Sequence, residues 1–336
     1  MRQTILILAF FICCFEQTKA NKIDSLKTDK DVERFISALY KQKHGINYTW
    51  YNTFHFAKPD SVNYHDRCDS TIKFESGIWQ KTDFNNDGLT DLFTIIYKLD
   101  TINSQYHDYP EYTVYVVIYQ KNNKYQLNEI PGVSISQCYT VKPTVVNDYP
   151  CLLYRHFIKS EYSIDTLPGM DTISGFAMPR LRTHYFLVGI TDTLIYKYGG
   201  FIELNTKNNN IPTIESIYYE TTTCLSFCPA FNLNIFKDGA AFYIRHENLD
   251  ESNGNYRGTI NQIQLDEIIG LINYINAPKL ENYYYADYTD MQSCKLIIYF
   301  SDGSVKEIND YGLQGTLGLV RLYDLLFALR HNQQWK

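Results

Sequence analysis

The sequence lacks three features that would quickly indicate a function: a long apolar run beyond its amino terminus, a block of like charges and the common catalytic motifs. Its most apolar later segment, residues 317–329, is interrupted by Arg321 and Asp324, whereas a membrane-spanning helix needs about 20 apolar residues. The 31 basic and 37 acidic residues give a net charge of −6, which disfavours nucleic acid and anionic membrane surfaces as partners. We therefore expect no nucleic-acid partner, and no transmembrane segment once the amino-terminal apolar run, described below as a signal, is removed.

Enzymatic signatures are also missing. The chain contains no G-x-S-x-G, no H-E-x-x-H and no G-x-x-x-x-G-K-[ST], the motifs of serine hydrolases, zinc proteases and nucleotide-binding enzymes. Asp287 and Asp290 form a close carboxylate pair, but glycosidase carboxylates usually come from separate strands and face each other across a cleft. The sequence therefore favours a non-enzymatic protein.

The amino terminus has the composition of a secretory signal. Arg2 precedes an apolar run over Ile5–Phe15, and small side chains at Thr18 and Ala20 suit cleavage after Ala20. Lipid attachment at a cysteine of this segment would need a small residue before it, and bulky residues stand there instead. We therefore expect residues 1–20 to be a signal peptide and the protein to be secreted or periplasmic rather than a lipoprotein.

The first part of the mature chain reads as one helix followed by strands. Thr28 and Asp31 resemble a capping box, and the apolar residues that follow recur at helical spacing, which predicts a helix over 30–43. Short apolar and aromatic runs such as Leu92–Tyr97, Tyr112–Tyr119 and Tyr185–Ile190 then predict strands. No helical pattern separates these runs, so residues 21–205 should form a mostly antiparallel β domain with one leading helix.

A polar stretch at 206–212 predicts a linker, and the pattern changes after it. Strands are expected at 213–221, 231–237, 240–246, 294–300 and 304–308, with Asp238-Gly239 and Asp302-Gly303 as hairpin turns. Apolar residues at helical spacing predict helices over 265–275 and 319–329. Residues 213–336 should therefore form a small α+β domain, and the whole chain should belong to the α+β class.

An acidic string at 83–91, Asp-Phe-Asn-Asn-Asp-Gly-Leu-Thr-Asp, is the most specific chemical signal. An EF-hand would place Glu at position 12 between flanking helices, whereas Thr94 stands there inside a predicted strand. The string resembles instead the calcium loop of the strand-loop-strand, integrin-like type. By that resemblance the side chains of Asp83, Asn85, Asp87 and Asp91 and the carbonyl of Leu89 would bind calcium. The alternative is a turn with solvated carboxylates, because Asn, Asp and Gly are also favoured turn residues.

Six cysteines remain after signal removal, at positions 68, 138, 151, 224, 228 and 294. In an oxidising compartment some of them should pair, and the nearest pair in sequence is Cys224 and Cys228. The string Cys224-Leu-Ser-Phe-Cys228-Pro229 is similar to the C-x3-C-P string of thioredoxin-fold copper chaperones, in which it opens a helix. Here a strand pattern follows, which favours a local disulfide over a copper or redox site.

The second domain also resembles a known family. The residues that carry the resemblance are Thr223-Cys224, Cys228-Pro229-Ala230-Phe231, Asp238-Gly239, Asp287-Tyr288-Thr289-Asp290, Asp310-Tyr311-Gly312 and Trp335. They are similar in type and spacing to an uncharacterised bacterial family, domain of unknown function 6438, over about residues 211–336. The resemblance implies a small α+β domain of secreted proteins and no particular activity.

The sequence thus predicts a secreted or periplasmic, non-enzymatic protein that is braced by calcium and binds a protein partner or a component of the cell envelope. Two alternatives stay open. One is a thiol-disulfide or copper-handling protein acting through Cys224 and Cys228, and the other is an unfamiliar hydrolase of envelope polymers.

Overall fold

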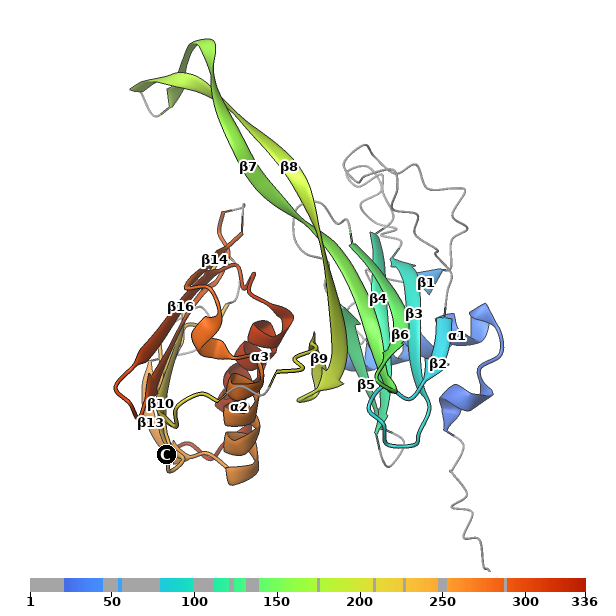
Figure 1. The fold of residues 1–336 in the computed structure, drawn as a ribbon. Coiled ribbons are helices and arrows are strands. Elements are labelled where there is room, and N and C mark those ends of the chain that lie inside the picture. Colours follow the sequence, from blue (N-terminus) through green and yellow to red (C-terminus); the bar gives the residue numbers. More distant parts are fainter. Residues whose placement is uncertain are drawn as a thin grey trace, which may run out of the picture.

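The fold is built from three sheets and three α-helices within the residues that the computed structural model describes (Figure 1). These residues are 21–44, 54–55, 79–98, 111–120, 124–130, 139–173, 176–207, 210–225, 228–246, 253–286 and 289–336, and for 157–187 only the backbone is described. The predicted signal, Cys68, Cys138 and Asp287 lie outside them.

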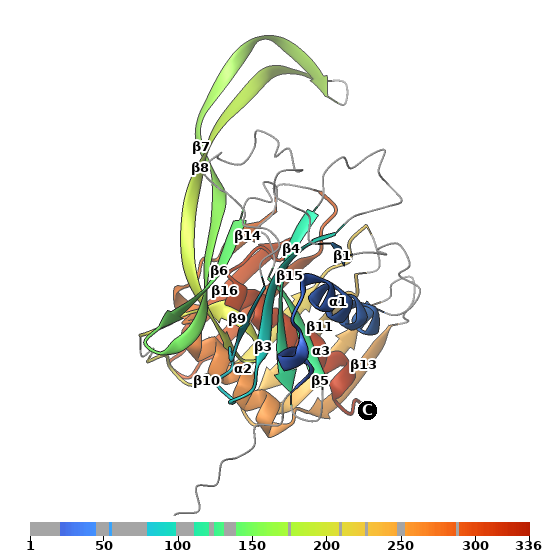
Figure 2. The ribbon, with the colours of Figure 1, turned by 90° about the vertical axis from the view of Figure 1, so that its right-hand side faces the viewer.

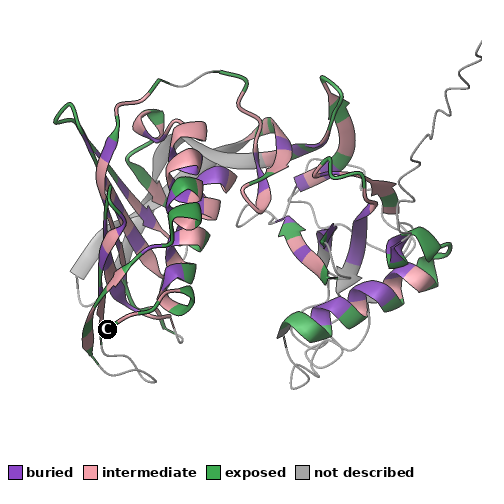
Figure 3. Cartoon of the chain, turned by 90° about the horizontal axis from the view of Figure 1, so that it is seen from below, coloured by how far each residue is buried: buried purple, intermediate pink, exposed green. Residues whose placement is uncertain are grey.

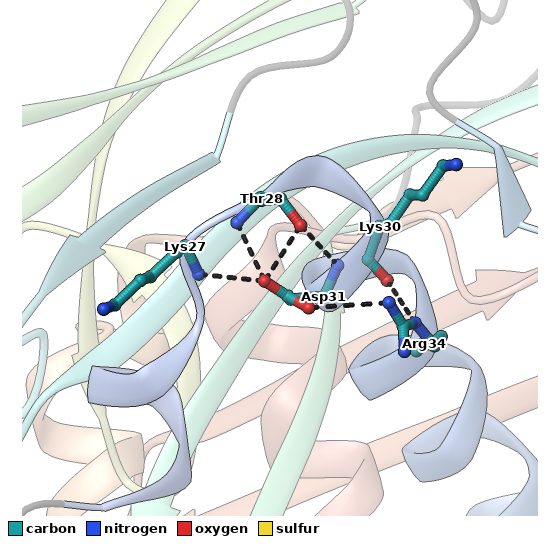
Figure 4. A network of polar contacts seen from close by, with 5 residues as sticks. All are labelled: Lys27, Thr28, Lys30, Asp31 and Arg34. Carbon is teal, nitrogen blue, oxygen red and sulfur yellow. Dashed lines mark hydrogen bonds and ion pairs between the residues drawn. The ribbon is translucent and has the colours of Figure 1, made fainter.

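Two helical elements open the described chain: η1 (Lys22–Ser25) and α1 (Asp29–His44). Thr28 and Asp31 cap α1 reciprocally, because the Asp31 carboxylate accepts the Thr28 N–H at 3.0 Å and the Asp31 N–H donates to the Thr28 hydroxyl at 3.3 Å (Figure 4). Hydrogen bonds from the Thr28 hydroxyl and from the Thr28 and Lys27 N–H groups hold the pKa of Asp31 below its usual value. The predicted helix and its cap are confirmed.

Sheet A is the sheet against which α1 packs. It has the order β1-β3-β4-β5, with β2 paired to β3, and all its pairs are antiparallel. Its strands are β1 (Phe54–His55), β2 (Trp79–Thr82), β3 (Asp91–Lys98), β4 (Glu111–Gln120) and β5 (Lys124–Ile130). Leu92 and Val117 face α1, while Phe93 and Val116 face the opposite side and pack against a second sheet. Sheet A is therefore buried on both faces.

Sheet B is that second sheet, with the order β6-β7-β8-β9. Its strands are β6 (Tyr139–Val146), β7 (Tyr149–Ile173), β8 (Phe176–Lys197) and β9 (Gly200–Glu203). The pairing of β6 with β7 ends at His156, and beyond it β7 and β8 pair only with each other up to Ile173 and Phe176. The two strands thus extend past the sheet as a long curved arm (Figures 1 and 2).

Sheet C forms the carboxy-terminal region with the order β13-β12-β11-β10-β15-β16-β14. Its strands are β10 (Ile214–Thr221), β11 (Phe231–Phe236), β12 (Ala240–Arg245), β13 (Gly254–Thr259), β14 (Tyr283–Tyr285), β15 (Ser293–Phe300) and β16 (Val305–Tyr311), with α2 (Gln262–Tyr274), η3 (Ala277–Lys279) and α3 (Leu317–Asn332). All neighbours are antiparallel except β14 and β16. Helices α2 and α3 cover one face of the sheet (Figures 1 and 3). Buried residues of the sheet and of the two helices belong to one hydrophobic core.

The sheet C region contacts the rest of the chain through β9 and the turn before it. The Glu203 carboxylate accepts the N–H groups of Leu317 and Gly318 at 2.6 and 2.8 Å, so a side chain of β9 caps the start of α3. In the β8–β9 turn, the Tyr198 carbonyl accepts a hydrogen bond from Arg321 Nε at 2.6 Å. These contacts fix α3 against sheet B.

The observed elements confirm the α+β class, with mostly antiparallel sheets and a leading helix. Residues 204–207 and 210–213 carry no helix or strand, and the predicted linker falls there. Across the described ranges, no helix combines the length and apolar character needed to cross a bilayer.

Candidate functional site

The acidic loop connects two paired strands. Thr82 at the end of β2 lies opposite Asp91 at the start of β3, so residues 83–90 form the loop of a hairpin. Asn86 and Gly88 have positive φ angles of 54° and 81°, which let the loop curl tightly. Thr94, the residue at position 12, lies buried within β3, so the structure agrees with a strand-loop-strand arrangement.

The loop carboxylates bind the loop's own backbone. Asp83 accepts the N–H groups of Asp87 and Gly88 at 3.1 and 2.8 Å. The Asp87 carboxylate accepts the Leu89 N–H at 2.9 Å and the Asn85 side-chain amide at 3.1 Å. These contacts close the loop as a set of side-chain-capped turns.

Asp91 differs from the other loop carboxylates because it is fully buried. Its two oxygens accept the N–H groups of Phe84 and Tyr119, each at 2.8 Å, which ties the loop to strand β4. Its pKa is raised to about 7, chiefly by burial and also by the neighbouring Asp83 and Asp87 carboxylates, against the opposing effect of the two hydrogen bonds. The loop thus gathers negative charge around a desolvated carboxylate.

No group of three or more His, Cys, Asp or Glu side chains with a metal-holding arrangement occurs among the described residues. The loop nevertheless places Asp83, Asp87 and Asp91 near one another, with the Asn85 amide beside Asp87. These are hard oxygen donors of the kind that calcium prefers. Calcium binding by Asp83, Asn85, Asp87, Leu89 and Asp91 stays a prediction.

Cys224 and Cys228 form a disulfide, with Cα atoms 5.4 Å apart. The disulfide closes a short loop between β10 and β11, and a strand rather than a helix follows it. Leu225 within this loop is 84% exposed. Cys151 and Cys294 are buried free thiols. The disulfide agrees with the structural interpretation of the C-x3-C-P string.

The Asp310-Tyr311-Gly312 motif has a structural role. The buried Asp310 carboxylate accepts the N–H groups of Gln314 and Gly315 at 2.7 and 2.9 Å and so shapes the turn before α3. Gly312 has φ +83°, and a Cβ there would approach the Ala286 Cβ within 2.6 Å. The motif therefore maintains a tight turn, and its carboxylate binds two backbone N–H groups of that turn.

Trp335 also has a packing role. Its ring lies 5.3 Å from the ring of Tyr243, and its indole N–H donates to the Leu329 carbonyl at 3.0 Å. Gly258 on β13 allows this approach, since a Cβ there would meet the indole at 3.0 Å. The next residue, Lys336, exchanges two backbone hydrogen bonds of 2.9 Å with Arg257. The motif residues thus hold the carboxy terminus against the sheet.

A cleft of about 710 Å³ lies where sheet A meets the sheet C region. It is lined by all of Tyr125–Ile130 on β5, by the turn at Gly199–Phe201, by Gln42 and Lys43 of α1, and by α3. The α3 residues are Leu317, Val320, Arg321 and Asp324. The sequence did not predict this cleft, because its lining comes from separate segments with no motif in common.

An amide network braces the floor of the cleft. The Gln126 amide donates to the Asn128 side-chain oxygen at 2.8 Å and to the Gly199 carbonyl at 2.7 Å. Its oxygen accepts from Gln120 at 3.0 Å and from the Tyr196 hydroxyl at 2.9 Å. Both donors and both acceptor positions of Gln126 are therefore used within the protein.

Residues 215–330 match the family described as Domain of unknown function (DUF6438). The match confirms the resemblance predicted for the carboxy-terminal domain, and it covers sheet C, α2 and most of α3. No curated protein matches the chain.

Proposed function

We propose that this chain is a non-enzymatic binding protein that works outside the cytoplasm and is braced by a calcium ion in the β2–β3 loop. The observation that carries the proposal is the loop itself, with three carboxylates gathered at a strand-loop-strand turn and one of them fully buried. The disulfide at Cys224–Cys228 supports an oxidising compartment, where such bonds persist. The predicted signal at residues 1–20 supports the same location.

A bound cation would offset the electrostatic cost of the loop. Without it, the desolvated position of Asp91 and the neighbouring Asp83 and Asp87 carboxylates disfavour its ionised form, as its raised pKa reports. Calcium supplies opposite charge to this group of oxygens and can bind carboxylates whose remaining lone pairs accept backbone N–H groups. Because Asp91 is also bonded to the Tyr119 N–H of β4, the ion would stabilise sheet A as well as the loop.

The partner in this proposal is a protein or a component of the cell envelope. Support comes from the cleft between β5 and α3, which has the volume of a typical ligand site and lies between two parts of the chain. The net charge of −6 disfavours polyanions such as nucleic acid.

Calorimetry and thermal unfolding of the mature chain test the calcium part. We expect calcium to release binding heat and to raise the unfolding temperature, and a chelator to reverse both. At a free calcium concentration 100 times the Kd, the free energy of unfolding should increase by about 2.7 kcal/mol. The variants Asp83→Asn and Asp87→Asn should lose the heat and the shift.

Asp302→Asn is the matched control. Asp302 also caps an Asp-Gly turn, accepting the Ser304 N–H at 2.9 Å, but it lies in sheet C away from the acidic loop. It should leave calcium binding unchanged. If the unaltered chain shows neither binding heat nor a change in unfolding temperature with chelator, the calcium part of the proposal is wrong.

A further inference from the structure

Among the described strands, none pairs with the outer edge of β5, which is the last strand of sheet A in the order β1-β3-β4-β5. Along an antiparallel strand, the N–H and C=O groups of successive residues point alternately toward the paired strand and away from it. The Leu127 carbonyl accepts Lys43 Nζ at 3.2 Å and so points away from β4. By alternation, Tyr125, Leu127 and Glu129 direct their N–H and C=O groups outward.

This outer edge of β5 faces the cleft. Every residue from Tyr125 to Ile130 lines it, and α3 forms the opposite wall with Leu317 and Val320 as apolar side chains. A strand edge opposite a helix is the arrangement that accepts an added strand, because main-chain groups of the edge bind a peptide and the helix contacts alternate side chains. The turn at Gly199–Phe201 and α1 also line the cleft and limit it.

We propose that the cleft binds an extended peptide segment of another protein, which adds to sheet A as a strand along β5 and lays alternate side chains against α3. The inference rests on the proposed function, since it names the class of partner for a binding protein. It assigns the recognition to backbone groups of β5 and to the apolar side chains of α3.

The charges of the lining favour an uncharged segment. Lys43 and Arg321 are balanced by Glu129 and Asp324, so the cleft presents no net charge to a ligand. The Gln126 amide has no remaining donor or acceptor for a ligand. The outward N–H and C=O groups of the β5 backbone match those of a peptide.

Lys43 protects the edge in the absence of a ligand. Its ammonium group covers the outward carbonyl of Leu127, and lysine at sheet edges is a common means of preventing unwanted strand pairing. An incoming peptide N–H would replace this single contact. Residues 124–130 contain no proline, so nothing in the covalent structure of the strand prevents pairing.

The experiment uses the mature chain with calcium and a displayed library of random decapeptides, followed by synthetic copies of the enriched peptides. Glu129→Pro removes one outward N–H at an exposed position, where proline costs no bond to β4. Glu129→Ala is its control, because it changes the side chain and keeps the N–H. We expect Glu129→Pro to weaken peptide binding at least tenfold and Glu129→Ala to change it by less than about threefold.

Val320→Glu is a second variant that leaves β5 unaltered. It places a charge on the α3 wall at a partly exposed position and should also weaken binding at least tenfold. Hydrogen exchange should show that the peptide protects the amides of Leu127 and Glu129. These results together would support strand addition.

Three outcomes would overturn the inference. They are the absence of any enriched peptide, equal binding by the unaltered chain and Glu129→Pro, and a dimer of the unaltered chain that Glu129→Pro converts to monomer, which would make a second copy the occupant. The calcium heat is measured on the same samples. If no peptide binds while calcium still binds, only the inference of strand addition is rejected. If calcium does not bind, the metal part of the proposed function is rejected.

Discussion

At the scale of residues, carboxylates in this chain repeatedly hold backbone N–H groups at the starts of helices. Asp31 caps α1 from its own first turn, and Asp310 shapes the turn that leads into α3. Glu203 reaches the first N–H groups of α3 from another sheet. Asp31 and Glu203 thus satisfy N–H groups that a helix start leaves unpaired and complement the positive end of its dipole, whereas Asp310 holds N–H groups of the preceding turn.

The cap formed by Glu203 should make stability depend on pH. Burial raises the pKa of Glu203, and the nearby Asp192 raises it further against three opposing backbone hydrogen bonds. A raised carboxyl pKa means that the folded chain binds the proton more tightly than the unfolded chain. The contribution of Glu203 protonation to the free energy of unfolding is therefore fully present below the pKa of the unfolded chain, at about 4.3. It declines as pH rises through the pKa of the folded chain.

We accordingly expect the unaltered chain to lose stability relative to Glu203→Gln as pH rises through this range, measured by urea unfolding at several pH values. Thr316→Ala is the control, because it removes the hydroxyl that accepts the Leu319 N–H and changes no charge. It should cost about 1 kcal/mol at every pH. A constant difference between the unaltered chain and Glu203→Gln would contradict the prediction.

Distance along the chain decided which of these caps could be predicted. Thr28 and Asp31 are three residues apart, so the sequence shows the pair directly. Glu203 and Leu317 are 114 residues apart, and no local pattern indicates their contact. The acidic loop was predictable as a turn with oxygen donors, but the buried contact of Asp91 with the Tyr119 N–H joins residues 28 positions apart, which no local pattern indicates.

At the scale of elements, the strands with alternating apolar residues matched their predictions. The strands β11 and β15 bury every second residue against the helices, and β10 does so from Ile217 onward, after a register shift between Ile214 and Ser216. Strand β13 was missed because its sequence, Gly-Asn-Tyr-Arg-Gly-Thr, has little apolar character. The predicted strand at Tyr185–Ile190 lies within β8, but the length of β7 and β8 was not predicted, because local patterns do not specify how far two strands continue to pair. The parallel strand β14 was missed because its pairing with β16 depends on a distant contact.

The two Asp-Gly hairpin turns in sheet C provide a matched pair for testing turn strain. Gly239 and Gly303 have nearly equal φ angles of +83° and +84°. A Cβ on Gly239 would lie 3.2 Å from the Ile260 carbonyl oxygen, whereas a Cβ on Gly303 would have no atom within 4 Å.

Gly303→Ala should cost about 1 kcal/mol from the left-handed backbone alone. Gly239→Ala should cost about 2 to 3 kcal/mol, because the carbonyl contact is added to the same backbone strain. Chemical denaturation of both variants measures the difference. Equal losses would mean that the loop at Ile260 moves away freely.

At the scale of the whole molecule, a narrow set of contacts joins the sheet C region to sheets A and B. The Arg321 guanidinium packs so closely against the β8–β9 turn that a Cβ on Gly199 would lie 2.6 Å from its Nη2. Arg321 also donates to the Tyr198 carbonyl at 2.6 Å. The same residue lines the cleft, so the contact that holds the two parts together also positions one wall of the proposed peptide site.

This arrangement predicts that Arg321→Ala uncouples the two parts. In the unaltered chain, calcium should protect the amides of β2 and β3 and, through β9 and α3, those of β10 and β11 as well. In Arg321→Ala, protection of β10 and β11 should no longer follow calcium, with a loss of coupling of about 1.5 to 3 kcal/mol, the scale of one hydrogen bond to a charged group. Hydrogen exchange read separately for the two pairs of strands measures this.

Arg257→Ala is the control, because Arg257 stacks 5.4 Å from the Phe242 ring within sheet C itself and contributes nothing to the contact with β9. If Arg321→Ala leaves the calcium response of β10 and β11 intact, the cap formed by Glu203 is sufficient to couple the two parts, and the α3 wall of the cleft is held without Arg321.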